Sequence, residues 1–406
     1  MEPPVPPFLL LLALLAASGL TRAQVETPLL DLSGVLPSLS RPANHSLIFH
    51  AVMFDAGSTG TRIHVYTFIQ KQLPVLDNEM FHSIKPGLSA YADSPEMVTV
   101  TLLLKVARRA VPRLDWKRTP LVLRATAGLR LLPAEKAQTL LDQVQHVFDE
   151  SPFLVPDGSV SIMDGTNEGI LAWISLNFLT GHLNANAKKT VGILDLGGGS
   201  TQITFLPKLK KTVEKAPVAD YVARFDFFNS TFELYSHSYL GNGIMAARLA
   251  TLGAVGAEGT VLNADLRVFC HRCGHAGYKL CYQEVLKVVK GIIHQPYELK
   301  DSNVFFAFSY YFDRAVDAGL IDGVQGGMLQ VRDFKKRAKE VCNKTTRYLP
   351  VSPFLCMDLT YIACLLKDGF GFKDGAMLQL TKKVNNVEAS WALGAMLDHF
   401  HNLKLH

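Results

Sequence analysis

The chain has 406 residues, of which 48% are hydrophobic and 19% charged, a composition that fits a folded globular protein and excludes a largely disordered one. Its length exceeds what one hydrophobic core usually serves, so two domains are expected. The net charge of +5 is mild, and no basic stripe with interleaved aromatic residues occurs, which argues against a nucleic-acid partner.

The N-terminal segment is predicted to be a signal peptide. An apolar run of about 13 residues within PFLLLLALLAASGL precedes the small residue Ala23, and such a run is too short to span a bilayer comfortably. The preceding MEPPVPP lacks the usual positive charge, so an uncleaved anchor is the alternative. We expect residues 1–23 to be removed, residues 24–44 to form an extension, and no later segment to span a membrane.

In chain order, segments typical of strands then alternate with segments typical of helices. The predicted strands occupy residues 50–57, 62–68, 119–128, 160–165 and 190–199. The predicted helices occupy residues 93–111, 133–148 and 168–181. Gly57 and Gly60 are expected to permit unusual backbone angles between the first two strands, and Ser94 to cap the first helix with Pro95 in its first position. This alternation predicts an α/β protein whose sheets are covered by helices.

Sequons and cysteines agree with a secretory route. N-x-[ST] sequons occur at Asn44, Asn229 and Asn343. The chain has six cysteines, and in an oxidising compartment disulfides are the default expectation. Cys342 and Cys356 close a short loop and are the expected pair.

The segment CHRCGHAGYKLC has two interpretations. Cys270, Cys273, His271 and His275 are all potential zinc ligands. A bridge between Cys270 and Cys281, with Cys273 left over, is the simpler explanation. Cys364 lies in the apolar stretch YIACLL and is expected to be a small buried side chain.

One phrase of the sequence occurs twice, as FDAGSTGTRIHVYTF from Phe54 and as LDLGGGSTQITF from Leu194. Each copy has an Asp at the end of a strand, a glycine-rich turn with Ser-Thr, and an alternating strand. Backbone N–H groups in such a turn, with Ser and Thr hydroxyls, can bind phosphate oxygens. The Asp can hold a divalent cation, usually through water. Two such hairpins would hold a polyphosphate from both sides of a cleft.

The two hairpins resemble the phosphate loops of the actin, Hsp70 and hexokinase superfamily. Five segments resemble, more narrowly, the conserved regions of the nucleoside triphosphate diphosphohydrolases, or apyrases: DAGSTGTRIHVY, LRATAGLRLL, DGTNEGILAW, LDLGGGSTQITF and VNNVEASWALGAML. KPGLSAY, HSYLG and LLKDGFGF resemble the soluble, lumenal nucleoside diphosphatase branch. The segments cover nearly all of the mature chain in the family's order.

The resemblance implies an α/β fold of two actin/Hsp70/hexokinase-like lobes with the active-site cleft between them. Lobe I is expected over residues 45–180 and lobe II over 181–378. The C-terminal segment, residues 379–406, is expected to contain a helix over 385–400 that returns to lobe I and closes the cleft.

Catalytic roles also follow from the resemblance. Glu168 begins a predicted helix, where an acidic residue can simply complement the helix dipole. In the family's EGxxxW pattern, however, the matching Glu is the catalytic base. Ser200 and Gln202 would hold the attacking water with it, whereas Asp164 is expected to be structural.

The remaining site residues are assigned by the same resemblance. Asp55 and Asp195 would hold Ca²⁺ or Mg²⁺ through its water shell, with Trp391 near those waters. The phosphate-binding residues would be Gly57, Ser58, Thr59, Thr126, Arg130, Gly198 and Gly199. The candidate nucleobase platforms are Tyr310, Tyr311, Phe312 and Phe370. For these aromatic residues, and for Trp391, core packing is the alternative.

The implied activity is hydrolysis of the terminal phosphate of nucleoside diphosphates, with UDP and GDP expected. The protein would be a monomer of the endoplasmic reticulum lumen or a secreted one, and removal of UDP there would support glycosylation and glycoprotein folding. An exopolyphosphatase is one alternative, because DLGGGST also resembles the loop of that family. A non-enzymatic nucleotide-binding module is another, and it would require the catalytic Glu to be missing.

Overall fold

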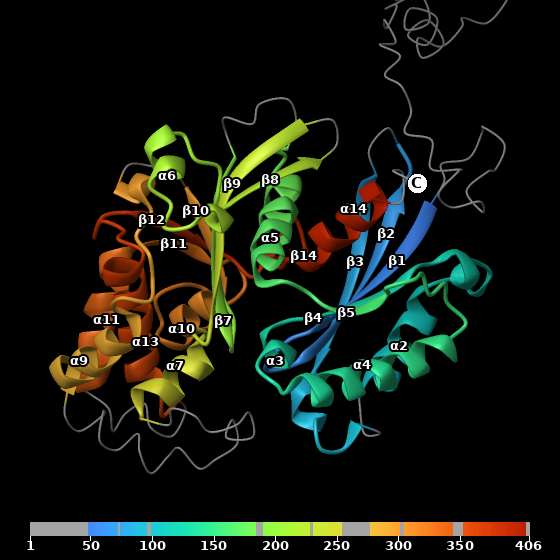
Figure 1. The fold of residues 1–406 in the computed structure, drawn as a ribbon, viewed down its shortest axis with the longest axis horizontal. Coiled ribbons are helices and arrows are strands. Elements are labelled where there is room, and N and C mark those ends of the chain that lie inside the picture. Colours follow the sequence, from blue (N-terminus) through green and yellow to red (C-terminus); the bar gives the residue numbers. More distant parts are fainter. Residues whose placement is uncertain are drawn as a thin grey trace, which may run out of the picture.

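The computed structural model describes residues 48–71, 74–95, 99–183, 190–227, 230–253, 277–300, 304–343 and 352–402 (Figure 1). The predicted signal peptide, Asn44, Asn229, Cys270 and Cys273 lie outside these residues. No helix in the described part of the chain is long and apolar enough to cross a bilayer.

The first sheet has five strands in the order β3-β2-β1-β4-β5. They are Val75–Ile84, Thr61–Ile69, Ile48–Ala56, Leu121–Ala125 and Val160–Ile162. β1, β2 and β3 are antiparallel, whereas β4 and β5 run parallel to β1. Because side chains alternate along a strand, Val52 and Phe54 of β1 pack toward α2 (Val100–Ala110) and α4 (Ala134–Asp149).

The second sheet has seven strands in the order β11-β12-β10-β6-β7-β9-β8. They are Gly327–Gln330, Met377–Leu380, Phe305–Ser309, Gly192–Leu196, Ser200–Phe205, Ser230–Leu240 and Val222–Phe227. One face packs on α7 (Ile244–Thr251), α9 (Gly277–Val289), α10 (Tyr310–Asp317), α11 (Val331–Asn343) and α13 (Leu355–Cys364). The sequence did not predict strand β3 or, in this sheet, strands β8 to β12.

A third core lies between the two sheets. It is built around α5 (Gly165–Leu179) and α14 (Ala392–Asn402), which Figure 1 shows between the sheets. α5 is apolar on nearly all sides, as expected of a helix that is covered on every face. α14 packs against α5 and β1, so the end of the chain lies beside its first described strand. The predicted lobe boundaries themselves stay a prediction.

Two helix starts differ from the sequence-based expectation. The helix expected from Pro95 begins at Val100, with Thr99 rather than Ser94 at its N-cap. The helix expected over 385–400 begins only at Ala392. Before it, Lys383–Val384 (β13) and Val387–Glu388 (β14) form a hairpin around Asn385 and Asn386, whose φ angles are 52° and 65°. Asparagine tolerates this left-handed conformation, so the NN pair makes a turn instead of a helix.

The disulfide between Cys342 and Cys356 is present and joins the end of α11 to α13. Cys364 is wholly buried, as expected. Cys281 is buried in α9, but Cys270, its expected partner, lies outside the described residues, so that bridge stays a prediction.

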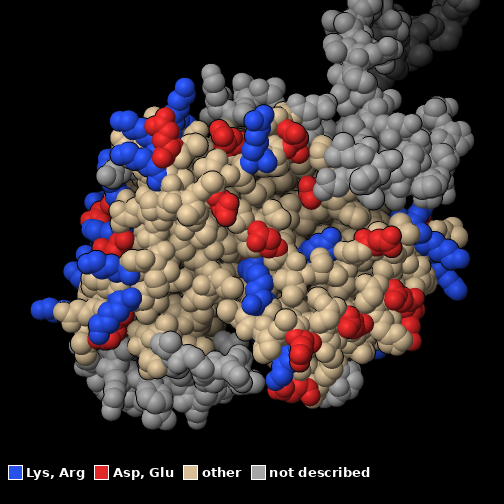
Figure 2. Space-filling view, in the orientation of Figure 1, with Lys and Arg blue, Asp and Glu red and all other residues tan. Residues whose placement is uncertain are grey.

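The surface carries charges of both signs. Figure 2 shows basic side chains gathered along the edge that is formed by α6 (Lys210–Glu214), α9 and α11, with acidic side chains between them. Three of the basic residues on this edge, Lys210, Lys211 and Lys336, are exposed. This pattern is typical of a solvated face.

Candidate active site

The repeated phrase folds into the same hairpin twice. The N–H of Gly57 donates to the carbonyl of Gly60 at 3.0 Å, and the N–H of Gly197 donates to the carbonyl of Ser200 at 3.0 Å. The strand register places Asp55 opposite Arg62 in the first hairpin and Asp195 opposite Gln202 in the second. Arg62 and Gln202 therefore occupy equivalent positions in the two hairpins.

The two turns approach each other closely. A Cβ atom on Gly198 would lie 2.6 Å from Cγ2 of Thr59 and 2.7 Å from Oγ of Ser58, so only glycine fits there without a shift. Neither Gly57 nor Gly60 has a positive φ, and the expectation of unusual backbone angles is wrong for both. A Cβ atom on Gly57 would lie 2.7 Å from Nη1 of Arg62, a side-chain end, and 3.1 Å from the carbonyl oxygen of Gly60.

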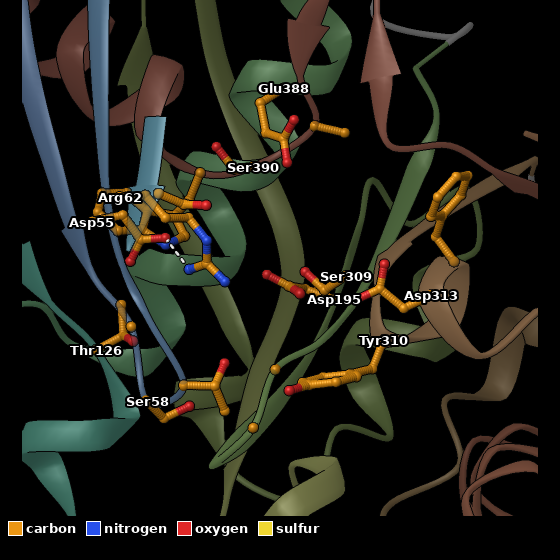
Figure 3. Close-up of a pocket in the computed structure, with 18 of the residues that line it drawn as sticks. Asp55, Ser58, Arg62, Thr126, Asp195, Ser309, Tyr310, Asp313, Glu388 and Ser390 are labelled. Atoms are coloured by element: carbon orange, nitrogen blue, oxygen red, sulfur yellow. Dashed lines mark hydrogen bonds and ion pairs between the residues drawn. The ribbon is translucent and has the colours of Figure 1, made fainter. Parts of the chain in front are cut away.

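A cavity of about 350 Å³ lies between the hairpins, and Figure 3 shows side chains of both sheets pointing into it. Eleven of the predicted site residues line it: Asp55, Gly57, Ser58, Thr59, Thr126, Glu168, Asp195, Gly198, Tyr310, Phe312 and Trp391. Thr126 reaches the cavity as the N-cap of α3 (Ala127–Arg130), directly after β4. The predicted phosphate site is thus assembled from segments that are distant in the sequence.

Glu168 is a buried carboxylate in the first turn of α5, 7% exposed. The helix cap is a different residue: Oδ1 of Asp164 accepts from the N–H groups of Thr166 at 2.8 Å and Asn167 at 3.2 Å. Asp164 is therefore structural, as expected, and Glu168 is not needed to satisfy the helix N-terminus.

The Glu168 carboxylate faces the second hairpin and the end of α3. Its Oε2 accepts from Nη2 of Arg130 at 2.6 Å and from Nε2 of Gln202 at 3.1 Å. Burial raises the pKa of Glu168 to about 7, with the Arg130 guanidinium acting in the opposite direction. A carboxylate with a pKa near the working pH is suited to act as a general base.

Three hydroxyl and amide groups surround this carboxylate. Nε2 of Gln202 lies 2.9 Å from Oγ of Ser200 and 2.8 Å from Oγ of Ser238. Nη2 of Arg130 lies 3.3 Å from Oγ of Ser200. Among the described residues, Oε1 of Gln202 is buried without a hydrogen-bond partner. A buried amide oxygen is expected to have a partner. The role of Ser200 and Gln202 in holding a water stays a prediction.

Arg130 and Gly199, unlike the other predicted phosphate ligands, are not among the residues that line the cavity. Arg130 directs its guanidinium at Glu168, so its phosphate-binding role stays a prediction. Gly199 packs against α3, where an added Cβ atom would lie 3.0 Å from Cβ of Ala127. The turn of the second hairpin therefore lies close to α3 as well as to the turn of the first hairpin.

Asp55 and Asp195 face the cavity from the two hairpins. Oδ2 of Asp55 accepts from Nη1 of Arg62 at 2.7 Å, whereas its Oδ1 is buried without a partner in the described structure. Oδ1 of Asp195 is likewise buried and unpartnered. Burial raises the pKa of Asp195 to about 6, and the hydroxyl of Ser309 opposes that rise.

These two carboxylate oxygens fit a hard divalent cation. An unpaired carboxylate oxygen is costly to bury, and oxygen ligands are what Ca²⁺ and Mg²⁺ prefer. The described residues contain no cluster of three or more His, Cys, Asp or Glu side chains that could enclose a metal ion. That Asp55 and Asp195 hold the ion through its water shell therefore stays a prediction.

The predicted nucleobase platform requires a correction. Tyr310 and Phe312 line the cavity, but Tyr311 and Phe370 are 0% exposed and belong to the core of the second sheet. Successive side chains of a helix point in different directions, so Tyr311 faces the core while Tyr310 faces the cavity. Tyr311 and Phe370 are not available to stack on a ligand.

The residues of the site that sequence reasoning missed include Arg62, Ser238, Ser309 and Glu388. A signal for Arg62 was present, because a short turn places it directly opposite Asp55. Ser238 lies within the quoted segment HSYLG but was not singled out. Glu388 likewise lies within the quoted segment VNNVEASWALGAML but was not singled out. Ser309 reaches the site through long-range packing, for which the sequence carries no local signal.

Comparison with known proteins finds similarity to nucleoside phosphatases, both in the family model and in individual relatives. The model of the GDA1/CD39 (nucleoside phosphatase) family matches residues 42–285 and 278–406. Mouse ectonucleoside triphosphate diphosphohydrolase 5 is 54% identical over 98% of this chain and 97% of its own. The human nucleoside diphosphate phosphatase ENTPD5 is 54% identical over 91% of each chain, and rat ectonucleoside triphosphate diphosphohydrolase 6 is 49% identical over 88% and 83%.

Two solved structures share the fold. A nucleoside triphosphate hydrolase from Neospora caninum superposes with a TM-score of 0.61 at 12% identity, covering 89% of this chain and 93% of that one. An exopolyphosphatase-like protein superposes with a TM-score of 0.50 at 14% identity, covering 87% and 99%. At these identities the likeness concerns the fold alone.

Proposed function

The chain belongs to the GDA1/CD39 nucleoside phosphatase family, and from this premise we propose that it hydrolyses nucleoside diphosphates to the monophosphate and inorganic phosphate. UDP and GDP are the expected substrates. The printed name of the human relative, nucleoside diphosphate phosphatase, supports this substrate class. The observation that carries the proposal is the buried Glu168 carboxylate beside Ser200 and Gln202, at the cavity where the two phosphate loops meet.

The proposed chemistry follows from the geometry of that cavity. The turn amides around Gly57 and Gly198, with the hydroxyls of Ser58 and Thr59, bind the phosphates. Ser200 and Gln202 orient a water, and Glu168 accepts its proton as the water attacks the terminal phosphorus in line with the leaving oxygen. Arg130 keeps the Glu168 carboxylate in place through the contact of 2.6 Å.

Nucleotidases of this family depend on a divalent cation. In this chain Asp55 and Asp195 would hold it through water, and Trp391 lies in the same cavity wall. When bound, the cation neutralises phosphate charge that develops as the bond breaks. Ca²⁺ and Mg²⁺ are the proposed ions.

A substrate panel tests the proposal. Phosphate release would be measured with UDP, UTP, UMP and long-chain polyphosphate, after chelator treatment and again after Ca²⁺ or Mg²⁺ is restored. We expect rapid release from UDP only when the cation is present. Release from polyphosphate without release from UDP would support the exopolyphosphatase alternative. Nucleotide binding without any hydrolysis would support the non-enzymatic one.

We also propose that the protein is a monomer of the endoplasmic reticulum lumen or a secreted one, where removal of UDP supports glycosylation and glycoprotein folding. The disulfide Cys342–Cys356 supports an oxidising compartment, and the sequon residue Asn343 is exposed at the end of α11. Mass spectrometry of protein from eukaryotic cells should find an N-terminus near Gln24 and a glycan at Asn343 or another sequon. An intact Met1 without any glycan would contradict this.

A further inference from the structure

Asp55 and Asp195 each have a buried Oδ1 without a hydrogen-bond partner in the described structure. Each also has a neighbouring donor, which is Arg62 for Asp55 and Ser309 for Asp195. We propose that Arg62 and Ser309 are positioning residues that hold Asp55 and Asp195, respectively, with Oδ1 directed at the cation. This inference rests on the proposed function, because it deepens the role of the same two carboxylates. Neither residue belongs to the set that the sequence resemblance assigned.

Arg62 is fixed on two sides. Its Nη1 donates to Oδ2 of Asp55 at 2.7 Å, across the strand pair that places the two residues opposite each other. The same Nη1 lies against Gly57, where an added Cβ atom would be only 2.7 Å away. The guanidinium therefore occupies the space between the carboxylate and the phosphate turn. With Oδ2 engaged in this way, Oδ1 of Asp55 is the atom left for the cavity.

Ser309 is held in a backbone conformation that serine rarely adopts. Its φ and ψ angles are 57° and −128°, at the point where β10 ends and α10 begins. The other non-glycine residues with positive φ in the described structure are Asn385 and Asn386, which form a two-residue hairpin turn that favours asparagine. Such strain persists where surrounding contacts over-determine it and is frequent at functional sites.

The strained conformation places Ser309 against Asp195. β10 pairs with β6, so that Ser309 lies opposite Leu196, the residue that follows Asp195. Figure 3 shows the two side chains adjacent at the centre of the cavity. The hydroxyl is the group that Ser309 presents to the carboxylate, while Oδ1 of Asp195 is unpartnered. Groups that orient metal-binding side chains in this way typically change metal affinity about 10–100-fold when removed.

Arg62→Gln separates a positioning role from a purely electrostatic one, because the two roles predict opposite changes in cation affinity. A nearby guanidinium repels a cation, so removing a purely electrostatic Arg62 would tighten cation binding. A positioning Arg62 predicts weaker binding, by about 10–100-fold. Tb³⁺ alone, which like Ca²⁺ prefers oxygen ligands, would be titrated against the full chain, with its emission excited through Trp391. Arg109→Gln, at an exposed position of α2, is the matched control.

Unchanged or tighter Tb³⁺ binding by Arg62→Gln would overturn the role of Arg62. If that variant does not fold, Arg62→Lys serves instead. Lysine retains a donor for Asp55 but lacks the planar guanidinium whose Nη1 lies beside Gly57, so a weaker but measurable affinity is expected. Wild-type affinity in Arg62→Lys would mean that any nearby positive charge is sufficient, which also overturns positioning.

Ser309→Ala and Ser309→Gly separate the hydroxyl from the backbone. Both variants lose the hydroxyl, so both should bind Tb³⁺ about tenfold more weakly than the wild type. Glycine accepts positive φ readily, so Ser309→Gly should have a higher Tm than Ser309→Ala. Ser151→Ala, in the turn after α4, is the control. Wild-type Tb³⁺ affinity in either Ser309 variant would show that the hydroxyl does not orient Asp195.

UDP hydrolysis, measured on the same proteins, distinguishes a failure of the positioning inference from a failure of the proposed function. If the wild type hydrolyses UDP with cation and the Arg62 and Ser309 variants bind Tb³⁺ normally, the positioning inference alone is wrong. If the wild type neither binds Tb³⁺ nor hydrolyses UDP, the proposed function is wrong and the inference with it. If the inference is correct, the variants need more cation for half-maximal activity, and excess cation restores most of kcat.

Discussion

Glu168→Gln is expected to lower kcat for UDP hydrolysis by at least about a hundredfold, because positioned acid–base groups typically contribute roughly 10²–10⁴ in rate. Glutamine keeps the shape, and its Oε1 can accept from Nη2 of Arg130 and Nε2 of Gln202 as the carboxylate does. What it loses is the ability to take a proton from the attacking water. Steady-state kinetics should therefore show a fall in kcat with little change in KM, since the proposed phosphate ligands are other residues.

The pH profile is the internal control for this variant. Burial raises the pKa of Glu168 to about 7, so the wild-type base is protonated below that pH and kcat/KM should fall by about tenfold per pH unit on the acid side. The glutamine of Glu168→Gln cannot titrate, so the residual kcat/KM of this variant should not fall on the acid side. Wild-type turnover by the variant would contradict the role of Glu168 as general base. If kcat/KM of the variant still fell on the acid side, another group would be the one that titrates.

The stability of Glu168→Gln should hold or rise slightly. The folded-state pKa of about 7 lies above the ordinary value of 4.5. The contribution of this carboxyl to stability is therefore greatest below about pH 4.5 and is lost as the pH rises through about 7. At pH 8 the ionised carboxylate opposes folding, and a neutral glutamine removes that penalty. A Tm at or above the wild-type value would separate a chemical defect from a folding defect.

Gly243→Ala is expected to reduce kcat/KM by about a hundredfold, since a displacement of about 1 Å at a site can cost that much. Gly243 is the N-cap of α7, in an extended conformation that alanine can adopt. An added Cβ atom would lie 2.4 Å from the carbonyl carbon of Gly198 and 2.5 Å from N of Gly199. These are backbone atoms of the phosphate turn, so the turn itself must move.

Hydrogen bonds from the start of α7 hold that turn, so a displacement of the turn would disturb them. The N–H groups of Met245 and Ala246 donate to the carbonyl of Gly198 at 2.9 Å and 3.1 Å. Gly375→Ala is the matched control, because a Cβ atom there meets nothing within 4 Å. Kinetics and Tm would be measured on both variants. Normal kcat/KM in Gly243→Ala would mean that the position of the second turn does not limit catalysis.

The local parts of the site could be predicted from the sequence. A strand, a short glycine turn and a second strand are close in the chain, so the pairing that places Asp55 and Asp195 at the ends of their strands is encoded within about a dozen residues. The same holds for the cap formed by Asp164 and for the loop closed by Cys342 and Cys356. The repetition of the hairpin also predicted that two such units would meet.

The tertiary structure decided which side chains reach the cavity. Tyr310 and Tyr311 are neighbours of the same type, yet one lines the cavity and the other is buried, because the direction of each is set by how α10 packs on its sheet. Phe370 follows the turn Leu365–Gly369 after α13, and it is buried because that segment packs into the core of the second sheet. The pairing of β10 with β6 brings Ser309 beside Asp195, although the two are more than a hundred residues apart.

The sequence by itself therefore determined the family, the α/β character and the chemical groups of the two hairpins, because these depend on residue types at short spacing. Only the tertiary structure decided that Arg130 pairs with Glu168 and that Gly198 and Gly243 have no room for a Cβ atom. Each of these depends on contacts between residues that are remote in the chain. Their geometry is set by the packing of three cores around two sheets, which no local pattern records.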